Sequence, residues 1–448
     1  MRSIRAYAKL QYMAEIRPFR GVRYDPSNAG DLASVICPPY DIIPPEMQDE
    51  LYRRSEFNFV RLEYSRGLPQ DTPQDNRYTR AATTLREWLT QGVLKAEDSP
   101  ALYLHDHYFS CGGKEYRRRG MIVRVRLEEW EKRVVHLHED TLSQPKSDRL
   151  NLMRALQGNT SPVLALYEDR KRYVSSLLVA SARCRPEMSI AADGERHEVW
   201  TITESEVIDQ IRSSLASQPL YIADGHHRYE SALAYRWEQL VRFPDASPGA
   251  GFDFVMMALV DFADPGLVIL PPHRLVRGIP KPTLDGLMSR LKAFFEVGGL
   301  SRNTPDAGQR VGDFLAGGAG EVRVVLFGPG KEQLFLLRLT DFAATDPLMP
   351  ASHSGLYRRL DVSIVDHVIV EKLLGMGAEE KALLAYSHES HDAVRRVLDG
   401  EYQLTILLRP VRAETIKAIA DAGDRMPRKS TYFYPKAPSG LVFYRFAG

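Results

Sequence analysis

Five consecutive residues in the stretch YIADGHHRYESAL, residues 221–233, combine an acid, a glycine, two imidazoles and a guanidinium. They are Asp224, Gly225, His226, His227 and Arg228. The apolar residues before them predict a buried strand, and the pattern after them predicts a helix. The first helical turn has backbone N–H groups without intrahelical partners, and the helix dipole makes that end positive. We therefore predict that the glycine, the histidines and the arginine bind phosphate through side-chain donors and close backbone approach.

Asp224 does not fit a phosphate site, because a carboxylate repels phosphate. Three other roles remain open: it could hold a metal ion, a substrate hydroxyl or amine, or one of the histidines. A Mg²⁺ ion that arrives with nucleotide phosphates and touches one or two carboxylates is the metal that fits best. Taken singly, an acid before a helix is most often a cap, and a histidine beside a strand is often a packed core residue. The whole set at one strand-to-helix turn favours a functional site.

Zinc is the second metal to weigh. His136 and His138 alternate along an expected strand, and His226 or His227 could join them. Adjacent histidines rarely both bind one ion, and no cysteine lies near them in the sequence. The pattern therefore argues against a structural zinc site at these positions.

A second group of charged residues lies upstream, in HLHEDTLSQPKSDR, residues 136–149. Phosphoryl transfer to an alcohol needs a base near the hydroxyl and cations around the phosphoryl group. Glu139 or Asp140 could be that base, and Lys146 and Arg149 could be the cations. A solvated loop explains each of these charges equally well, so their role depends on where the fold places them.

The segment MPRKSTYFYPKAPSG, residues 426–440, collects basic and aromatic residues. Lys429 or Lys436 could bind phosphate while a tyrosine stacks on adenine. An ordinary C-terminal hairpin would instead pack the tyrosines and leave the lysines in water. Arg274, in PPHRLV, is a further candidate, as the cation for a substrate carboxylate.

Hydrophobic periodicity predicts the elements that must position these groups. Apolar residues after the histidine turn recur at helical spacing, which predicts a helix lying on a sheet. They are Tyr229, Ala232, Leu233, Trp237 and Leu240. Alternation on both sides of residues 111–113 predicts a β-hairpin over 101–130, with the arginines of 117–119 at a solvated strand end.

Other segments have simpler interpretations. Helices are expected from about residue 78 to 90 and after Pro145, and a strand is expected over 161–169. The segment LFGPGKEQLFLL lacks the GxxxxGK[ST] spacing of a phosphate loop, so it predicts a hairpin turn. In LDVSIVDH, Asp361 is expected to cap a helix, and His367 is expected to pack rather than face a site.

Composition bounds the class of protein. The chain has 448 residues, enough for two or three domains, and 44% of them are hydrophobic. A formal net charge of +1 argues against a nucleic-acid or membrane-surface binder. The three cysteines form no CxxC pair, which is typical of a reducing compartment. No segment is apolar enough to span a bilayer and no secretory signal is visible, so a cytoplasmic location is expected.

Nearly the whole sequence resembles a broad bacterial family, the domain-of-unknown-function 1015 family. The resemblance begins near Met13, so residues 1–12 are expected to be an extension. The motifs that carry it are IRPFRGVRYDP, VICPPYDII, PKSDRLNLMRA, SPVLALYED, ADGHHRYESAL, PPHRLV, LDVSIVDHVI and MPRKSTYFYPKAPSGLV. The family names no reaction.

The motif ADGHHRYESAL is also similar to the helix-start motif of the ParB/sulfiredoxin-like superfamily, and most closely to that of the archaeal ADP-dependent free serine kinases. In those kinases an upstream His-Glu pair supplies the catalytic base, and His138–Glu139 occupies the matching place here. The resemblance implies an α/β protein with mixed sheets and a ParB/sulfiredoxin-like core over 131–275. An N-terminal α/β region, 13–130, and a C-terminal one, 276–448, would flank that core.

These observations predict a kinase that uses ATP or ADP with Mg²⁺ and phosphorylates the hydroxyl of a small serine-like amino or hydroxy acid. Glu139 would be the base, assisted by His138, and Asp224 would orient substrate or Mg²⁺. One alternative is a nucleotide-binding regulator of the ParB/CTP type without turnover. Another is a DNA-acting ParB-like protein, which the near-neutral charge disfavours because phosphate neutralisation demands a basic surface.

Overall fold

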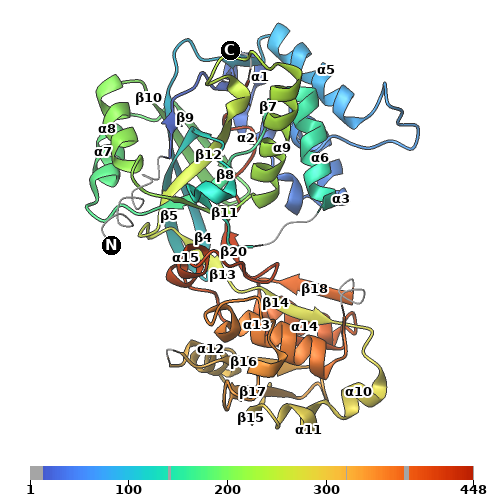
Figure 1. The fold of residues 1–448 in the computed structure, drawn as a ribbon. Coiled ribbons are helices and arrows are strands. Elements are labelled where there is room, and N and C mark those ends of the chain that lie inside the picture. The colour runs from blue at the N-terminus through green and yellow to red at the C-terminus, as the bar shows by residue number, and fades with distance from the viewer. Residues whose placement is uncertain (1–13, 140–142, 319, 378–382, 447–448) are drawn as a thin grey trace, which may run out of the picture. The chain divides into compact units, whose positions relative to one another are not determined.

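The computed structural model describes residues 14–139, 143–318, 320–377 and 383–446 (Figure 1). The chain divides into two compact units. The first unit comprises the chain up to His136, Thr141–Val268 and Pro435–Gly448; the second comprises Leu137–Asp140 and Ile269–Tyr434. The expected extension over residues 1–12 and the alternative base Asp140 lie outside the described residues.

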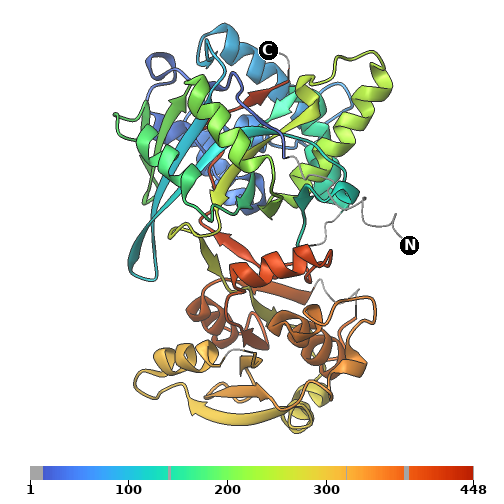
Figure 2. The ribbon, with the colours of Figure 1, turned by 60° about the vertical axis from the view of Figure 1, so that its left-hand side comes forward.

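A mixed nine-stranded sheet forms the centre of the first unit. Its strand order is β6-β11-β8-β12-β5-β4-β10-β9, and β1 pairs with β5 beside this path. Only the pairs β6–β11 and β8–β12 are parallel within this sheet. The strands are β1 (Ile16–Arg17), β4 (Leu102–Cys111), β5 (Lys114–Arg126), β6 (Val135–His136), β8 (Val163–Tyr167), β9 (Met188–Ala192), β10 (Glu195–Ile202), β11 (Leu220–Asp224) and β12 (Phe254–Asp261). The tip of the β4–β5 hairpin projects from the sheet (Figure 2).

Helices flank this sheet in two groups (Figure 1). Helix α6 packs against both α5 and α9, while α7 packs against α8. The helices are α1 (Pro26–Ala29), α2 (Leu32–Val35), α3 (Pro45–Arg54), α4 (Val60–Glu63), α5 (Arg77–Thr90), α6 (Ser143–Leu156), α7 (Tyr173–Ser181), α8 (Ser205–Leu215) and α9 (His226–Arg242). Short 3₁₀ turns are η1 (Tyr40–Ile42), η2 (Trp130–Lys132) and η3 (Gly251–Asp253). Two short ladders, β2 (Val22–Tyr24) with β3 (Leu94–Ala96) and β7 (Gly158–Asn159) with β21 (Tyr444–Arg445), complete the unit.

An apolar cluster of the N-terminal helices holds this part of the first unit together. Val35, Leu51, Phe59 and Trp88 lie in it, and Leu152 of α6 joins them. The side chain of Asn76 caps α5 and the side chain of Thr79 returns the bond, so the helix begins where the capping pattern demands. Tyr40 of the motif VICPPYDII lies against Arg149 of α6.

The second unit contains a six-stranded antiparallel sheet in the order β15-β17-β16-β19-β14-β18. Helices α12 and α14 pack on it through Val311, Leu315, Ala393 and Val397. The strands are β14 (His273–Val276), β15 (Phe295–Ser301), β16 (Arg323–Phe327), β17 (Gln333–Leu339), β18 (Leu384–Ser387) and β19 (Leu404–Leu407), and β13 (Val268–Leu270) pairs with β20 (Tyr432–Tyr434). The helices are α10 (Lys281–Asp285), α11 (Leu287–Leu291), α12 (Ala307–Ala316), α13 (Asp361–Ile364), α14 (Ser390–Leu398) and α15 (Ala413–Asp421), with turns η4 (Asp346–Leu348) and η5 (Tyr357–Arg359) and a π-helix, η6 (Val365–Leu373).

The mixed α/β fold is confirmed, and so are several local predictions. The hairpin of β4 and β5, the helix α5 and the strand–turn–helix of β11 and α9 form where the sequence predicts them. Residues 328–332 join the antiparallel strands β16 and β17, so the glycine-rich segment is a hairpin turn. Among the described residues, no helix is long and apolar enough to cross a membrane. The ParB/sulfiredoxin-like core stays a prediction.

Three local predictions are wrong. Arg118 is buried, with 4% of its surface exposed, because its strand neighbours and Pro435 cover it; it does not lie at a solvated strand end. Trp237 is 57% exposed and donates its indole N–H to Glu129, so it does not belong to the buried face of α9. Asp361 is the first residue of α13 rather than its cap, and its carboxylate binds Arg409 instead.

Candidate functional site

The predicted phosphate turn begins at Gly225, between β11 and α9. Its φ of 91° lies in the left-handed region, which glycine adopts without steric cost. A Cβ at this position would lie 2.7 Å from the Nε atom of Arg228. The space that the missing side chain leaves is therefore taken by a guanidinium of the same helix.

Asp224 lies between two cations. The Nη2 atom of Arg228 donates to Oδ2 of Asp224 at 2.5 Å, and the Nζ atom of Lys436 donates to Oδ1. Burial alone would raise the pKa of Asp224, but Lys436 first and then Arg228 hold that pKa well below its usual range. Asp224 is therefore an anion at neutral pH, and the three groups together carry one net positive charge at the N-terminus of α9.

The other predicted phosphate ligands differ in how they are held. The Nη1 atom of Arg228 donates to the carbonyl oxygen of Pro162 at 2.5 Å, so both ends of this guanidinium are engaged inside the first unit. His226 is buried as the first residue of α9, and its charge would act directly on Asp224. His227 is half-buried. Because Asp224 and Pro162 already engage its guanidinium, Arg228 is poorly placed to bind an anion.

A buried polar network lies next to this turn. Glu63 is fully buried, and its Oε1 atom accepts from the Oγ atom of Ser161 at 3.1 Å, from the backbone N–H of Tyr40 at 3.3 Å and from Arg149 at 3.4 Å. The guanidinium of Arg149 lies 3.9 Å from the ring centre of Tyr40 and donates to Asp148 at 2.6 and 2.9 Å. Two carboxylates thus already neutralise Arg149, which leaves it poorly placed to hold phosphate.

Tyr40 connects the network to the turn. Burial is the main reason that the pKa of Tyr40 is raised, and the charges of Asp224 and Arg228 also act on its hydroxyl. The cavity beside Glu63, Arg77 and Arg149 measures only about 10 Å³, which is room for one water molecule. Nothing as large as a nucleotide fits this cavity.

Lys146 lies on α6 and pairs with Glu230 of α9 at 2.9 Å.

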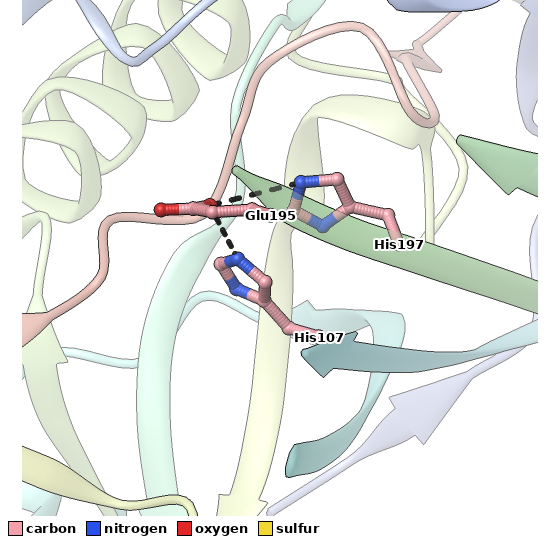
Figure 3. A group of neighbouring side chains, drawn as sticks. All are labelled: His107, Glu195 and His197. Atoms are coloured by element: carbon pink, nitrogen blue, oxygen red, sulfur yellow. Dashed lines mark hydrogen bonds and ion pairs between the residues drawn. The ribbon is translucent and has the colours of Figure 1, made fainter. Parts of the chain in front are cut away.

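A histidine cluster lies on two adjacent strands of the same sheet, β4 and β10, and Arg118 of the next strand, β5, contacts it. In the strand register His107 faces His197 on one side and Arg118 on the other. The Nε2 atom of His107 lies 2.6 Å from Oε2 of Glu195, and Nε2 of His197 lies 3.8 Å from the same oxygen (Figure 3). Nε2 of His105 lies 3.2 Å from Nδ1 of His197. Arg118 donates to Nδ1 of His107 at 3.1 Å and to the carbonyl oxygen of Pro435 at 2.8 Å.

The electrostatics of this cluster follow from its burial. Burial holds the pKa of His107 well below its ordinary value, and it lowers the pKa of His197 to about 3. Both imidazoles are therefore neutral at pH 7, with one lone pair each. Sequence reasoning missed the cluster, although HDH at 105–107 and ERH at 195–197 alternate as strand faces require.

In the second unit Glu139 is held by the segment that precedes β20. Its Oε1 atom accepts from the backbone N–H groups of Ser430 and Thr431 at 3.1 and 3.0 Å and from the Thr431 hydroxyl at 2.9 Å. Nε2 of His138 lies 3.0 Å from that hydroxyl oxygen. Because the hydroxyl proton points to Glu139, His138 must donate to Thr431, so His138 positions the threonine that orients the carboxylate.

The remaining candidates of the second unit serve its internal structure. Arg274 is fully buried and donates to Asp366 at 3.1 and 3.2 Å, to Pro272 O at 2.6 Å and to Lys429 O at 3.2 Å. His367 lies on the π-helix and contacts the Tyr357 hydroxyl at 2.9 Å. The guanidinium of Arg274 is thus engaged by a carboxylate and two carbonyl oxygens, and substrate binding by it stays a prediction.

A family model described as a protein of unknown function, DUF1015, matches residues 16–363, which is more than half of the chain. The chain belongs to this family. Three motifs of this DUF1015 protein meet in the first unit: VICPPYDII supplies Tyr40, PKSDRLNLMRA supplies Arg149 and ADGHHRYESAL supplies Asp224. The comparison with curated proteins gave no match.

Solved structures with a remote likeness complete the comparisons. A conserved hypothetical protein from Pyrococcus furiosus is 15% identical, with a TM-score of 0.35, over 71% of this chain and 95% of its own. A free serine kinase in complex with ADP is 12% identical, with a TM-score of 0.35, over 72% and 92%. SbnI with a C-terminal truncation, from Staphylococcus aureus, is 9% identical, with a TM-score of 0.35, over 72% and 86%. Likenesses of this size do not bear on what the DUF1015 protein binds.

Proposed function

We propose that this DUF1015 protein is a nucleotide-dependent phosphotransferase that phosphorylates the hydroxyl of a small serine-like amino or hydroxy acid. The observation that carries the proposal is the arrangement at the β11–α9 turn, where Asp224 lies between Arg228 and Lys436. One carboxylate and two cations leave a net positive charge at the positive end of a helix of 17 residues. Such an end binds phosphate oxygens through its backbone N–H groups.

The roles at the turn follow from these contacts. The N–H groups and imidazoles of His226 and His227 would bind the nucleotide phosphates, with Arg228 holding the turn in shape. Lys436 can exchange its carboxylate partner for a phosphate oxygen, because its flexible chain carries a compact point charge. Asp224, relieved of Lys436, offers one carboxylate to Mg²⁺, which commonly binds one or two carboxylates together with phosphate oxygens. ATP or ADP with Mg²⁺ is the proposed cofactor pair.

Glu139 is the proposed base for the acceptor hydroxyl. Three donors occupy its Oε1 atom and fix the plane of the carboxylate, so Oε2 is the oxygen that would take the proton. The resemblance of the His138–Glu139 pair to the catalytic pair of the free serine kinases supports this role. Because the kinases that this motif pair resembles are ADP-dependent, adenine nucleotides are the first ligands to test.

Two measurements on the full chain test the proposal. Calorimetry with ADP, ATP and CTP, each with and without Mg²⁺, should give saturable binding of an adenine nucleotide. Phosphorus NMR with small hydroxy acids, amino acids and sugars should then detect a new phosphate ester of a hydroxy or amino acid. Binding of CTP without any product would favour the regulatory alternative, and an absence of binding to all three nucleotides would exclude the kinase.

The variant Lys436→Met removes the contact of Lys436 with Asp224, on which the proposal rests. It should weaken nucleotide binding by about tenfold or more, because an interaction with a charged partner contributes roughly 1.5–3 kcal/mol. Lys132→Met is the matched control, since this lysine is 61% exposed and pairs with Glu128. Equal nucleotide affinity in wild type, Lys436→Met and Lys132→Met would remove the phosphate role from Lys436.

A further inference from the structure

We propose that His107, Glu195 and His197 form a binding site for one divalent transition-metal ion of the zinc class. The three residues lie in the first unit on the neighbouring strands β4 and β10. Among the described residues this is the one group of three or more His, Cys, Asp or Glu side chains whose ligand atoms all lie within 4.8 Å of one another. The inference does not depend on the phosphotransferase function.

Strand geometry places the ligands. His107 and His197 form a directly opposed cross-strand pair, and Glu195 lies two residues before His197 on the same face of β10 (Figure 3). Two ligand atoms of one tetrahedral zinc ion lie about 3.4 Å apart, given zinc–nitrogen and zinc–oxygen distances near 2.1 Å. The observed separations of 2.6 Å and 3.8 Å from Glu195 Oε2 bracket that value. Changes of less than about 1 Å in these two separations would match it.

The ligand chemistry selects the class of metal. Two imidazole nitrogens and one carboxylate suit Zn²⁺ and its neighbours in the first transition row, whereas Mg²⁺ and Ca²⁺ prefer an all-oxygen shell. Glu195 retains 27% of its side-chain surface exposed, while His107 and His197 retain 1% and 3%. An ion could therefore enter from the Glu195 side, where water can take the fourth position.

His105 would support the site as a hydrogen-bond partner of His197, without binding the ion itself. Its Nε2 atom lies 3.2 Å from Nδ1 of His197. If the Nδ1–H group of His197 donates to His105, the Nε2 atom of His197 keeps its lone pair directed toward Glu195 and the ion. Metal-binding histidines commonly donate their second N–H group in this way, which fixes the ring and its tautomer.

Arg118 is the internal competitor of the metal. Its guanidinium donates to Nδ1 of His107, so the ring proton lies on Nε2 and points to Glu195. Metal binding at Nε2 requires that proton to move to Nδ1 through solvent, with no net change in protonation. The new Nδ1–H group of His107 and the guanidinium of Arg118 are then both hydrogen-bond donors and face each other without an acceptor between them. Arg118 must leave His107 and retain its bond to Pro435, so removing Arg118 should favour the metal.

Cobalt serves as the probe because four-coordinate Co²⁺ absorbs strongly in the visible range. The full chain is stripped with a chelator, desalted and titrated with Co²⁺, and Zn²⁺ is then added as a competitor. We expect one equivalent of Co²⁺ with this absorption, which Zn²⁺ abolishes. X-ray absorption of the zinc-loaded wild type should show nitrogen and oxygen ligands near 2.1 Å, with the signature of two imidazoles. This measurement needs no variant.

Three variants test whether the Co²⁺ ion binds at His107, Glu195 and His197. Glu195→Gln should weaken Co²⁺ binding by about tenfold or more, and Arg118→Met, if folded by circular dichroism, should strengthen it. Glu198→Gln is the matched control, because Glu198 lies on the opposite face of β10 and should leave affinity unchanged. The proposal is overturned if the wild type takes up no Co²⁺ at millimolar concentration, if Glu195→Gln and wild type bind equally, or if zinc-loaded protein has fewer than two imidazole ligands.

Discussion

The ammonium group of Lys436 donates to the carboxylate of Asp224, which lies 212 residues earlier in the chain. This contact ties the last segment of the first unit to the turn between β11 and α9. Lys436 has 9% of its side-chain surface exposed and Asp224 has 18%, so solvent screens the pair only weakly. The C-terminal segment is therefore part of the candidate phosphate site.

Replacement of Asp224 should cost more stability than replacement of Lys436. Lys436→Met leaves Asp224 still neutralised by Arg228, and we expect a loss of about 1–2 kcal/mol in the free energy of unfolding, less than the 3–5 kcal/mol of a fully orphaned charge. Asp224→Asn leaves two cations side by side and should lose about 3 kcal/mol or more. Urea unfolding followed by circular dichroism measures both, with Lys132→Met as the exposed control. The reverse order of the two losses would contradict the charge balance inferred at the turn.

Glu139→Gln should separate binding from chemistry. The amide keeps the shape of the carboxylate, so nucleotide affinity should stay within a factor of about two, while transfer falls by about 10²–10⁴-fold if general-base catalysis is the whole effect. Single-turnover assays with the acceptor found by phosphorus NMR measure the rate. Glu131→Gln, at an exposed position of η2, is the control. Unchanged turnover in Glu139→Gln would assign the base to another residue.

The sequence predicts the turn well because its parts are local. The strand and the helix both follow from residues 220–242. Arg228 follows Asp224 by four residues, but Asp224 ends β11 and α9 begins only at His226, so their pairing depends on the conformation of Gly225. The pair of Asp224 with Lys436 was not predictable, because no local pattern connects positions so far apart.

The histidine cluster, like the pair of Asp224 with Lys436, could not be predicted from local sequence. The alternating residues at 105–107 and 195–197 indicate strand faces, but their meeting depends on the register between β4 and β10. Arg118 was predicted to be solvated because three consecutive arginines are typical of a surface. Its burial depends on covering by Pro435, more than 300 residues away in the chain. Long-range packing therefore decides what the local pattern leaves open.

Arg149 should prove structural rather than phosphate-binding. Arg149→Met leaves the buried carboxylate of Glu63 without its cation, and we expect a loss of about 3–5 kcal/mol in the free energy of unfolding. Nucleotide affinity, measured by calorimetry on folded protein, should change less than about threefold. Lys146→Met is the comparison, because its pair with Glu230 is 39% exposed on the lysine side and should contribute about 1 kcal/mol or less. A large loss of nucleotide affinity in Arg149→Met at unchanged stability would restore the phosphate role.

The stability of the second unit should fall as the pH drops from about 6.5 to 4, and His273 is the residue that tests this. His273 is 3% exposed, and its Nδ1 atom accepts from the backbone N–H of Leu408 at 3.1 Å. Burial first, and then the charges of His388 and Arg274, lower the pKa of His273 to about 4.

The sign of the effect follows from proton uptake. In the unfolded chain the imidazole takes up a proton near pH 6.5, whereas in the folded unit it does so only near pH 4. Between these values the unfolded state binds more protons, so the free energy of unfolding decreases with falling pH, by up to about 3 kcal/mol. Urea unfolding of wild type and His273→Gln at pH 7.5, 6 and 5 gives the slope of the free energy of unfolding against pH for each protein. The exposed His391→Gln is the control. Wild type should lose more stability over this range than His273→Gln, and equal slopes would show that His273 is not kept neutral by the fold.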